Sequence, residues 1–440
     1  MTLRPDSPER ASALVFAVMP PGAEETPEER DRMTEIAELI ESADMNVAGQ
    51  VVQHKRRPDP RTYLGPGKLA ELRAAVAESG ATCAVCEDDL TPGQVAAVLD
   101  ALDVDVLDRT ELILSVFSRH AHSLEGRLQV DLAQLQYELT RVRGQGHVMS
   151  RLGAGTDMRG PGEQKLEVDR RVIRQRIQTL RGRIARMTRT RRTQRGRRVR
   201  ADLPLIALAG YTNAGKSTLL NALVGQVVAK AEDRLFATLD PTSRQVKLGD
   251  GQTAIVTDTV GFIHKLPHQL VDAFRATLEE VTRADVLLEI VDASDRHFAE
   301  HRATVQTVLE ELGAGDKPRL VTFNKADLIE AAARDGDTPA PAIAGQVLIS
   351  AVTGYGLETL RAELSALLAS IWVDVDVAIP YRAGELLARV RERGTIELDY
   401  RSGDVRVTGR VSPPLAGELE AVAGKWRESL RSGDGADPDS

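Results

Sequence analysis

One glycine-rich segment brings together the residue types best suited to phosphate chemistry. An apolar run, residues 205–209, leads into Gly210, Tyr211, Thr212, Asn213, Ala214, Gly215, Lys216, Ser217 and Thr218, and a helical sequence follows. Glycines with this spacing between a strand and a helix let backbone N–H groups converge on phosphates at a helix N-terminus. Lys216 would reach the β and γ phosphates, and the Ser217 hydroxyl would ligate Mg²⁺. The segment predicts a nucleoside triphosphate site.

Three later motifs, each after an apolar run, predict which nucleotide binds. They are Asp258, Thr259, Val260 and Gly261 after residues 254–256; Asn324, Lys325, Ala326 and Asp327 after 319–323; and Ser350, Ala351 and Val352 after 347–349. Asp258 would act on the magnesium from its second shell, and the Gly261 N–H would contact the γ-phosphate. The Asp327 carboxylate can accept two hydrogen bonds from guanine N1 and N2, which adenine does not offer, and a backbone N–H near Ser350 can read guanine O6. The order and placement of the motifs predict a GTP site.

The residues that would complete catalysis lie outside the motifs named so far or have more than one candidate. The candidate magnesium-sensing threonine is Thr238, within Phe236, Ala237, Thr238, Leu239 and Asp240, whereas Thr212, Thr242 and Thr259 are interpreted as ordinary loop hydroxyls. We therefore predict Lys216, Thr238 and Gly261 as catalytic residues, with Ser217 and Thr238 as metal ligands. Asn213 could hold a potassium ion beside the phosphates or could simply stabilise the loop.

Phe262 stands where Ras-like enzymes carry a water-orienting glutamine. A phenyl ring neither donates to nor accepts from water. This predicts slow hydrolysis by the isolated protein and acceleration by a partner.

The elements around these motifs indicate an α/β protein with several domains, because 440 residues exceed what one core usually covers. Residues 1–108 alternate short apolar strands (13–18, 47–52, 82–86 and 104–107) with helical stretches, which predicts a small α/β domain with a parallel sheet. Thr26, Pro27 and Glu29 form a capping box that starts one helix. Residues 203–370 alternate in the same way and form the predicted nucleotide domain, a mostly parallel sheet with helices on both faces. Residues 371–440 predict a small α+β domain whose strand, helix and hairpin lie within 373–411.

Residues 109–202 have the pattern of a long antiparallel helical hairpin with a basic character. Apolar residues recur every three or four positions in two stretches: Leu124, Leu128, Leu132, Leu135, Leu139 and Val142, then Leu166, Ile173, Ile177, Leu180, Ile184 and Met187. Between them, residues 143–162 contain six glycines together with Arg143, Arg151 and Arg159.

The net charge is −8, yet residues 141–200 hold 19 Lys/Arg against 4 Asp/Glu, including Arg189, Arg191, Arg192, Arg195, Arg197, Arg198 and Arg200. The hairpin is either a solvated linker or an RNA-facing element. The arginines and the glycine-rich tip together favour contact with the RNA backbone.

Other features limit the class of protein. No run of about 18 apolar residues exists, and the N-terminus lacks a basic and then apolar signal, so we expect no membrane insertion and a cytoplasmic location. Cys83 and Cys86 could be redox-active or half of a metal site. They lie in a short apolar strand without a second pair, and we interpret them as core residues.

The chain resembles the HflX family of translational GTPases, relatives of the Obg proteins. The resemblance rests on GYTNAGKSTLLNAL, LFATLDPT, DTVGFIHKLP, AFRATLEE and NKAD, and outside these on RRPDPRTYLGPGK, DRTELILSVF, EGRLQVDLAQLQYEL and RGPGEQKLEVDRR. It extends over nearly the whole chain. Gln164 departs from it, since the family usually has threonine there, and the stretch HVMSRLGAGTDM is less typical.

The resemblance implies an N-terminal α/β domain, a helical hairpin, a G domain and a small C-terminal domain. It implies Mg²⁺ as cofactor, GTP and GDP as ligands, and binding to the large ribosomal subunit and its RNA, with the N-terminal domain and the hairpin tip toward the peptidyl transferase region. It also implies splitting or rescue of stalled ribosomes under stress. We expect a monomer. The alternatives are a GTPase of ribosome assembly or RNA remodelling, and an interaction module whose nucleotide is only structural.

Overall fold

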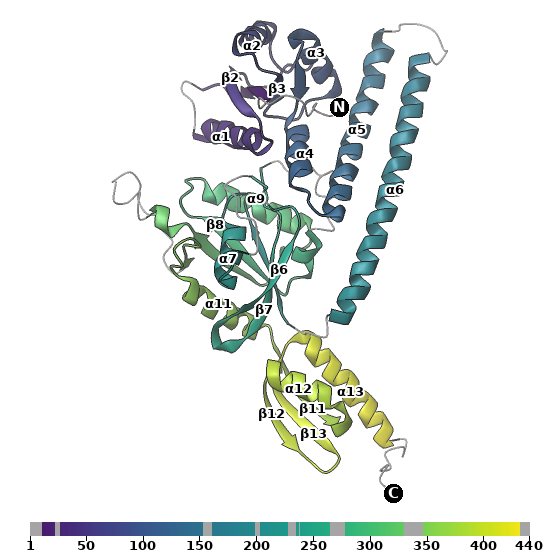
Figure 1. Ribbon diagram of the computed structural model, residues 1–440, viewed down its shortest axis with the longest axis vertical. Helices are drawn as coiled ribbons and strands as arrows, with labels where there is room; N and C mark the ends of the chain where they lie inside the picture. The colour runs from purple at the N-terminus through teal and green to yellow at the C-terminus, as the bar shows by residue number, and fades with distance from the viewer. Residues whose placement is uncertain are drawn as a thin grey trace. The chain divides into compact units, whose positions relative to one another are not determined.

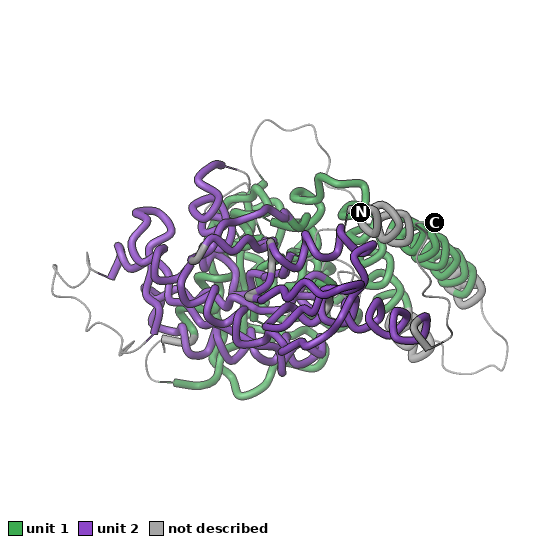
Figure 2. Tube along the Cα trace, turned by 90° about the horizontal axis from the view of Figure 1, so that it is seen from below, with its two compact units in different colours: residues 1–192, 230–241, 259–279 green, residues 193–229, 242–258, 280–440 purple. Residues whose placement is uncertain are grey.

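The computed structural model describes residues 11–22, 27–152, 161–198, 203–227, 235–236, 238–264, 278–329 and 346–431. The chain forms two compact units, coloured green and purple in Figure 2. One unit comprises residues 1–192 with the returning segments 230–241 and 259–279. The other comprises residues 193–229, 242–258 and 280–440. Each unit is described by itself below.

The first unit begins with a four-stranded sheet. Its strands are β1 (Ser12–Met19), β2 (Asn46–His54), β3 (Cys83–Cys86) and β4 (Asp105–Leu107). They are parallel, as the sequence predicted, and lie in the order β2-β1-β3-β4. The helices α1 (Pro27–Ser42), α2 (Pro66–Ser79) and α3 (Pro92–Leu102) each begin with a proline, whose fixed φ suits the first helical turn. The predicted start at Pro27 is confirmed, while Thr26 lies outside the described residues.

Three helices follow the sheet, and two of them form the predicted hairpin (Figure 1). They are α4 (Arg109–His120), α5 (Leu124–Leu152) and α6 (Pro161–Arg198). The chain breaks between α4 and α5 because Ser123 starts a new helix, its Oγ accepting a hydrogen bond from the Gly126 N–H at 2.9 Å. Arg170 of α6 donates to the carbonyl of Val142 of α5 at 3.1 Å. Since these positions lie near the end of α5 and the start of α6, the two helices run antiparallel.

The second unit contains the predicted nucleotide domain. Its strands are β5 (Leu205–Gly210), β6 (Thr242–Lys247), β7 (Thr253–Asp258), β8 (Val286–Asp292), β9 (Arg319–Asn324) and β10 (Val347–Leu348). Their order is β10-β9-β8-β5-β7-β6, and only β6 is antiparallel to its neighbour. This confirms a mostly parallel sheet, whose strands end at one edge and can bring loop residues together there.

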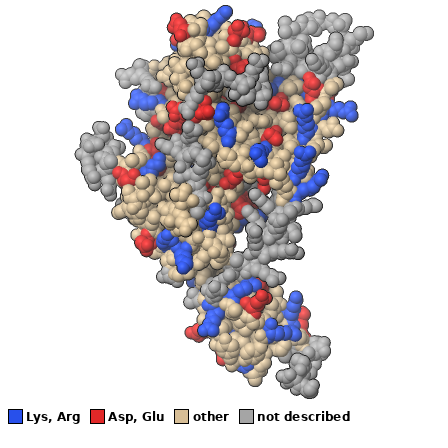
Figure 3. Space-filling model, in the orientation of Figure 1, with Lys and Arg blue, Asp and Glu red and all other residues tan. Residues whose placement is uncertain are grey.

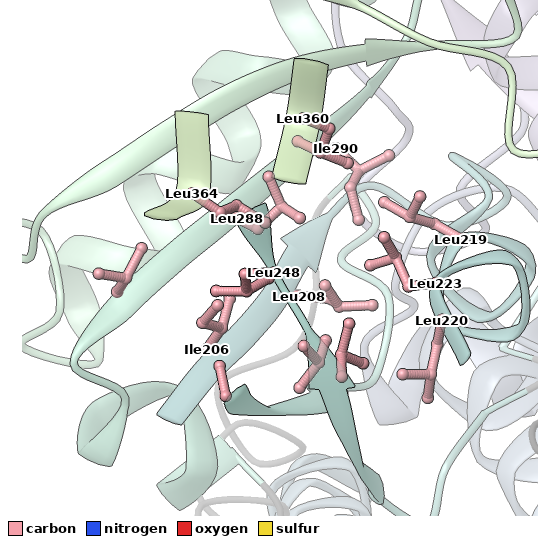
Figure 4. Packing of buried hydrophobic residues seen from close by; sticks show 14 of the residues in the cluster. Ile206, Leu208, Leu219, Leu220, Leu223, Leu248, Leu288, Ile290, Leu360 and Leu364 are labelled. Carbon is pink, nitrogen blue, oxygen red and sulfur yellow. The ribbon is translucent and has the colours of Figure 1, made fainter. Parts of the chain in front are cut away.

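Helices cover this sheet and close its core. They include α7 (Lys216–Val224), α9 (Phe298–Glu311) and α11 (Leu357–Ser370), and the short turn η1 (Gly249–Gly251) precedes β7. Figure 4 shows Leu208 and Leu288 of the sheet packed between Leu219 of α7 and Leu360 of α11, all fully buried. Burying such apolar side chains is the main stabilising term. The core therefore fixes where β5 ends and where the loop that follows it begins.

The chain continues into a small α+β domain with its own core. It consists of β11 (Val373–Pro380), η2 (Tyr381–Ala383), α12 (Gly384–Arg393), β12 (Thr395–Tyr400), β13 (Asp404–Val411) and α13 (Pro413–Arg431). The strands form an antiparallel sheet in the order β11-β13-β12. Ile379, Val390, Val407 and Leu419 are buried in its core. The strand, helix and hairpin were expected from the sequence, whereas α13 was not.

Two simpler expectations can also be compared with the structure. Cys83 and Cys86 are reduced and buried in β3, and burial raises the pKa of the Cys83 thiol to about 11. A thiol in that state is a poor nucleophile at neutral pH, in keeping with the core interpretation. Within the part of the chain that the structure describes, no helix is both long and apolar enough to cross a bilayer.

Candidate functional site

The loop after β5 has the tight backbone that a phosphate cradle needs. Gly210 and Gly215 have φ values of 157° and 90°, a region that favours glycine. A Cβ atom on Gly210 would collide with the carbonyl of Ile290, and one on Gly215 would collide with the amide of Asn324. Both glycines are therefore required by close approach as well as by φ. The loop ends at the N-terminus of α7, where backbone N–H groups and the helix dipole favour an anion.

Lys216 is held inside this loop. Its side chain is buried, and Nζ donates to the carbonyl oxygens of Tyr211 at 2.7 Å and Gly210 at 3.2 Å. Burial lowers the pKa of Lys216 to about 8, and the Asp258 carboxylate opposes that shift. Close by in the chain, the buried Oγ1 of Thr212 has no hydrogen-bond partner among the described residues. A buried cation and an unsatisfied hydroxyl within one loop suit a phosphate group.

Two oxygen-bearing side chains stand where the predicted magnesium would bind. The Ser217 hydroxyl donates to Asp258 Oδ2 at 2.6 Å, joining the start of α7 to the end of β7. Hydroxyl and carboxylate oxygens are the ligands that Mg²⁺ prefers, and it completes its shell with waters and substrate phosphates. The described residues contain no group of three or more His, Cys, Asp or Glu that could hold a metal alone. This donor set fits a magnesium ion that arrives with a nucleotide.

Asn324, the last residue of β9, joins two loops of the site. Its Nδ2 donates to the Ala214 carbonyl at 2.9 Å, and its Oδ1 accepts from the Ala351 N–H at 3.0 Å. The side chain is 2% exposed, so these bonds form away from water and hold both loops in place. Lys325 follows with a positive φ of 67°, and its Nζ lies 2.6 Å from Asp292 Oδ2 at the end of β8. Sequence reasoning missed Asp292, although its place at a strand end could have marked it.

Asp327 and Ser350, predicted to read guanine, lie together. The Ser350 hydroxyl donates to Asp327 Oδ1 at 2.6 Å and accepts from the Thr353 N–H at 3.1 Å. Ala351 is buried, whereas Val352 is 77% exposed. One unit thus gathers the residues from Gly210 to Thr218, Asp258, residues 324–327 and residues 350–352 at one edge of its sheet.

The remaining predicted residues belong to the other unit. They are Phe236, Thr238, Leu239, Thr259, Val260 and Gly261, while Ala237 lies outside the described residues. Phe236 has a positive φ of 59°, and its ring packs edge-on against Phe117 of α4 with centroids 4.5 Å apart. The Leu235 N–H donates to Ser42 Oγ at 3.0 Å. This candidate switch segment is therefore held by α1 and α4.

Asp240 links the same segment to the hairpin. Its Oδ2 accepts from the Ser123 N–H at 2.7 Å, and its Oδ1 accepts from the Ser123 hydroxyl. A Cβ on Gly126 would press against this carboxylate, so the first turn of α5 fits closely around it. Asp240 thus helps to cap α5 only two residues after Thr238. Sequence reasoning missed this contact because it joins residues 117 positions apart.

The segment after Asp258 is held in a similar way. Arg109, 1% exposed at the start of α4, donates to the His264 carbonyl at 3.1 Å and pairs with Glu35. Phe262, between Gly261 and His264, is 1% exposed. Its buried ring offers no group to an attacking water, as predicted for a phenyl side chain at this position.

The P-loop also has an aromatic support that sequence reasoning missed. The ring of His301, on α9, stacks on Tyr211 with centroids 3.8 Å apart and planes 6° from parallel. His301 Nδ1 lies 2.9 Å from Asp295 Oδ2, and hydrogen bonding to His301 contributes to lowering the pKa of Asp295. The stack fixes the side chain of Tyr211, whose carbonyl receives the Lys216 ammonium. Only the folded arrangement of α9 reveals it.

Comparison with known proteins gives the class of the protein and then its family. Residues 205–325 match the family model described as "50S ribosome-binding GTPase", and this match with the parallel sheet and glycine-rich loop defines a P-loop GTPase, an enzyme that hydrolyses GTP. Residues 30–118 and 120–198 match the models "GTP-binding GTPase N-terminal" and "GTP-binding GTPase Middle Region".

Curated relatives name the family. The chain is 42% identical to "GTPase HflX" of Caldanaerobacter subterraneus subsp. tengcongensis, over 88% of this chain and 89% of the relative. It is 38% identical to "GTPase HflX" of Escherichia coli, over 87% of this chain and 90% of the relative. The chain belongs to the HflX family of GTPases. A GTP-binding protein from Sulfolobus solfataricus, solved in complex with GDP, is 23% identical with a TM-score of 0.41, over 81% of this chain and 98% of that structure.

The lowered pKa of Lys216 gives a testable pH dependence. The ammonium loses its proton near pH 8 in the nucleotide-free protein, whereas bound phosphates would raise that pKa. We expect GTP affinity to be flat below pH 8 and to fall above it by up to tenfold per pH unit, with uptake of a proton on binding. Calorimetric titrations between pH 7 and 9 in buffers of different ionisation enthalpy would measure both effects.

The matched control for this prediction is Lys216→Arg. The guanidinium of Arg stays charged between pH 7 and 9. Protonation of the nucleotide itself affects the wild type and the variant equally. Its affinity should show no extra fall above pH 8. If wild type and variant follow the same pH curve, the proton does not come from Lys216.

Asn213 carries a separate prediction about monovalent ions. It lies in the loop with a positive φ of 58°, beside the residues that would hold the phosphates. A potassium ion there could supply positive charge to the transition state, as an arginine finger does elsewhere. We expect faster GTP turnover in potassium than in sodium buffer of equal ionic strength, and loss of that difference in Asn213→Ala. Equal wild-type turnover in the two buffers would mean that Asn213 only stabilises the loop and holds no potassium ion.

Proposed function

We propose that this GTPase binds the large ribosomal subunit and uses GTP binding and hydrolysis to split or rescue stalled ribosomes, under stress and in the cytoplasm. The observation that carries the proposal is the basic hairpin. Arg171, Arg176, Arg181 and Arg183 of α6 are exposed, and none makes an ion pair with a described residue. Lys and Arg side chains recur along α6 in Figure 3. The name of the family model that matches residues 205–325 supports the same partner.

The sequence prediction relied on further arginines of the hairpin. Side chains of Arg143, Arg151, Arg159 and the run from Arg189 to Arg200 lie outside the described residues. Unpaired guanidinium groups on a helix bind phosphates at low desolvation cost, because no internal ion pair has to be broken. An RNA backbone is therefore the partner chemistry that we infer for the hairpin.

In the proposed mechanism each motif has one task. Backbone N–H groups from Gly210 to Thr218 hold the phosphates, and Lys216 places its charge on the β and γ groups. Ser217 and Thr238 would bind Mg²⁺, which neutralises charge on the phosphates when it is bound. Asp258 would orient the magnesium shell, and the Gly261 N–H would contact the γ-phosphate.

Base recognition is assigned to a second group of residues. Asn324 and Lys325 would hold the loop around the base, while Asp327 and the backbone of residues 350–352 would read guanine. The distances from Asn324 to Ala214 and Ala351 support this division, since one amide positions both loops.

Binding to RNA is tested by removing charge from the hairpin. We expect Gln at positions 171, 176, 181 and 183 together to weaken binding to large subunits. The slope of log affinity against log salt should fall by about one for each phosphate that is no longer neutralised. Lys at the same positions keeps the charge and should keep the slope. GTP affinity should be unchanged in both variants. If the Gln variant has the same affinity for large subunits and the same salt slope as the wild type, the hairpin is a solvated linker and does not bind RNA.

The splitting activity is tested on mature ribosomes. Incubation of joined ribosomes with the protein and GTP, followed by sedimentation, should convert joined particles into subunits. The alternative, a role in ribosome assembly or RNA remodelling, predicts binding to immature large subunits and no splitting. If joined ribosomes stay intact while immature subunits bind, the assembly function replaces the one proposed.

A further inference from the structure

The ammonium of Lys216 is oriented by two carbonyls of its own loop. Its Nζ donates to the carbonyl of Tyr211 at 2.7 Å and to that of Gly210 at 3.2 Å. A lysine ammonium has three N–H donors and no acceptor. Two donors are therefore used within the loop, and one is left for a phosphate oxygen. The positions of the two carbonyls set the direction of that third N–H.

The two carbonyls are held in different ways. Gly210 is the last residue of β5 and pairs with Ile290 of β8, so the sheet fixes its carbonyl. Tyr211 lies one residue beyond the strand, and its carbonyl also accepts from the Ala214 N–H of the same loop at 3.4 Å. The side chain of Tyr211 connects this carbonyl to a helix outside the loop.

That connection is the stack on His301 of α9. The Tyr211 ring is buried, and the two rings lie 3.8 Å apart between centroids with planes 6° from parallel. A tyrosine ring held face to face cannot change rotamer without breaking the contact, so the stack also restrains the backbone that carries the ring. The placement of the Tyr211 carbonyl therefore depends on His301.

Asp295 fixes the orientation of His301. Its Oδ2 lies 2.9 Å from His301 Nδ1, and its Oδ1 accepts from the His297 N–H at 2.8 Å. Burial raises the pKa of Asp295, but hydrogen bonds from the His301 ring and the His297 N–H outweigh it and lower that pKa. The carboxylate is thus ionised at neutral pH and can only accept, so His301 Nδ1 carries a proton. This contact forms in the neutral and in the charged imidazole alike.

The helix that carries His301 is itself anchored to the sheet. One turn before His301, Phe298 packs edge-on against Phe323 of β9, with centroids 5.7 Å apart. Arg302, the residue after His301, donates from Nε to Glu289 of β8 at 2.9 Å. His301 is therefore presented to Tyr211 from a fixed position.

We propose that His301, held by Asp295, is a positioning residue for GTP hydrolysis. Its stack on Tyr211 fixes the carbonyl that directs the ammonium of Lys216, and with it the charge that meets the phosphates. The inference rests on the proposed role of Lys216 and adds to it two residues that no nucleotide motif contains. His301 acts through Tyr211 and is distinct from the groups assigned to bind the nucleotide.

Positioning of this kind matters most in the transition state. Phosphoryl transfer is accelerated mainly by charges that are already in place when negative charge develops on the phosphates. A displaced Tyr211 carbonyl turns the third N–H of Lys216 away from its target. A change at His301 is therefore expected to lower the rate of hydrolysis more than the affinity for GTP.

The first test compares the full chain carrying His301→Ala with the wild type. Loss of an aromatic stack corresponds to a factor of about two to ten in an equilibrium constant, and we expect GTP affinity to fall by this factor. Single-turnover hydrolysis at saturating GTP should slow by at least about tenfold, since misplacing a group by about 1 Å can cost about 100-fold in rate. Hydrolysis at the wild-type rate would overturn the inference.

Two further substitutions separate the ring from its hydrogen bond. His301→Phe keeps a flat ring for Tyr211, whereas His301→Gln keeps a donor for Asp295 but has no ring. The Phe variant should hydrolyse GTP nearly as the wild type does, and the Gln variant should resemble His301→Ala. The matched control is Thr307→Ala, an exposed position of α9 whose hydroxyl donates to the Ala303 carbonyl of the same helix. Circular dichroism should be unchanged in all four variants. Equal rates in the Phe and Gln variants would contradict a role for the stack.

A cycle with Lys216→Ala shows whether His301 acts through the ammonium. If Lys216→Ala alone leaves GTP affinity unchanged, the proposed role of Lys216 fails. If it lowers affinity, adding His301→Ala should cause little further loss, because no ammonium remains to be oriented. A full additional loss in the double variant would mean that His301 acts by another route. That result would overturn the inference while leaving the proposed role of Lys216 intact.

Discussion

Asp327→Asn is expected to lower GTP affinity by about 10⁴-fold and to favour xanthosine triphosphate instead. The proposed site offers a carboxylate with two acceptors to the N1 and N2 edge of guanine, and a buried polar site left mismatched discriminates by about this factor. Xanthine carries an oxygen in place of the N2 amino group, so the Asn amide can donate to it. Affinities for both nucleotides, measured by fluorescence of labelled analogues, would test the exchange.

The contact between Ser350 and Asp327 provides a milder control. The Ser350 hydroxyl donates to Asp327 Oδ1 at 2.6 Å, so Ser350→Ala should loosen the carboxylate without changing its charge. We expect a loss of roughly tenfold in GTP affinity or less, as for one hydrogen bond to a charged group, and no gain for xanthosine triphosphate. Unchanged GTP affinity in Asp327→Asn would contradict the assignment of the base site.

The second large effect expected is acceleration of GTP hydrolysis by the large ribosomal subunit. Phe262 is buried and offers neither donor nor acceptor to water, so the isolated protein lacks a positioning group at this place in the chain. Positioning and electrostatic stabilisation are most of phosphoryl-transfer catalysis. Groups supplied by a partner can raise the rate by about 10³ to 10⁵, or roughly 4 to 7 kcal/mol of barrier.

Single-turnover hydrolysis, first alone and then with saturating large subunits, measures this acceleration. Small subunits at the same concentration are the control for nonspecific effects of RNA. A rate that is already fast alone, or that large subunits leave unchanged, would mean that the catalytic site is complete without a partner.

Much of the nucleotide domain could be predicted because its signals are local. The strand before Gly210, the glycine spacing and the start of α7 at Lys216 follow from short-range sterics and hydrophobic pattern. The parallel sheet of the N-terminal domain could be predicted for the same reason, since its short apolar strands alternate with helical stretches. The place of Asn324 at the end of a strand could be predicted, whereas its hydrogen bond to the Ala214 carbonyl could not.

Contacts between distant segments could not be predicted. The stack of His301 on Tyr211 and the bonds from Ser123 to Asp240 depend on how helices pack, and no spacing along the chain encodes them. The hydrogen bond from the Tyr63 hydroxyl to Asp88, which follows β3, is of the same kind.

The hydrogen bonds of the Asp240 carboxylate limit how strongly the segment of Thr238 and the start of α5 can be coupled. It joins the segment of Thr238 to the cap of α5, so a rearrangement of that segment on nucleotide exchange would alter the start of the hairpin. Thermodynamic linkage is reciprocal: if the hairpin binds RNA as proposed, that RNA must then change nucleotide affinity by the same factor that the nucleotide changes RNA affinity. A cap of this type contributes about 0.5 to 2 kcal/mol. This one contact can therefore transmit a factor of at most about 30 in either direction, and any larger coupling must be shared with the contacts of Phe236 and Arg109.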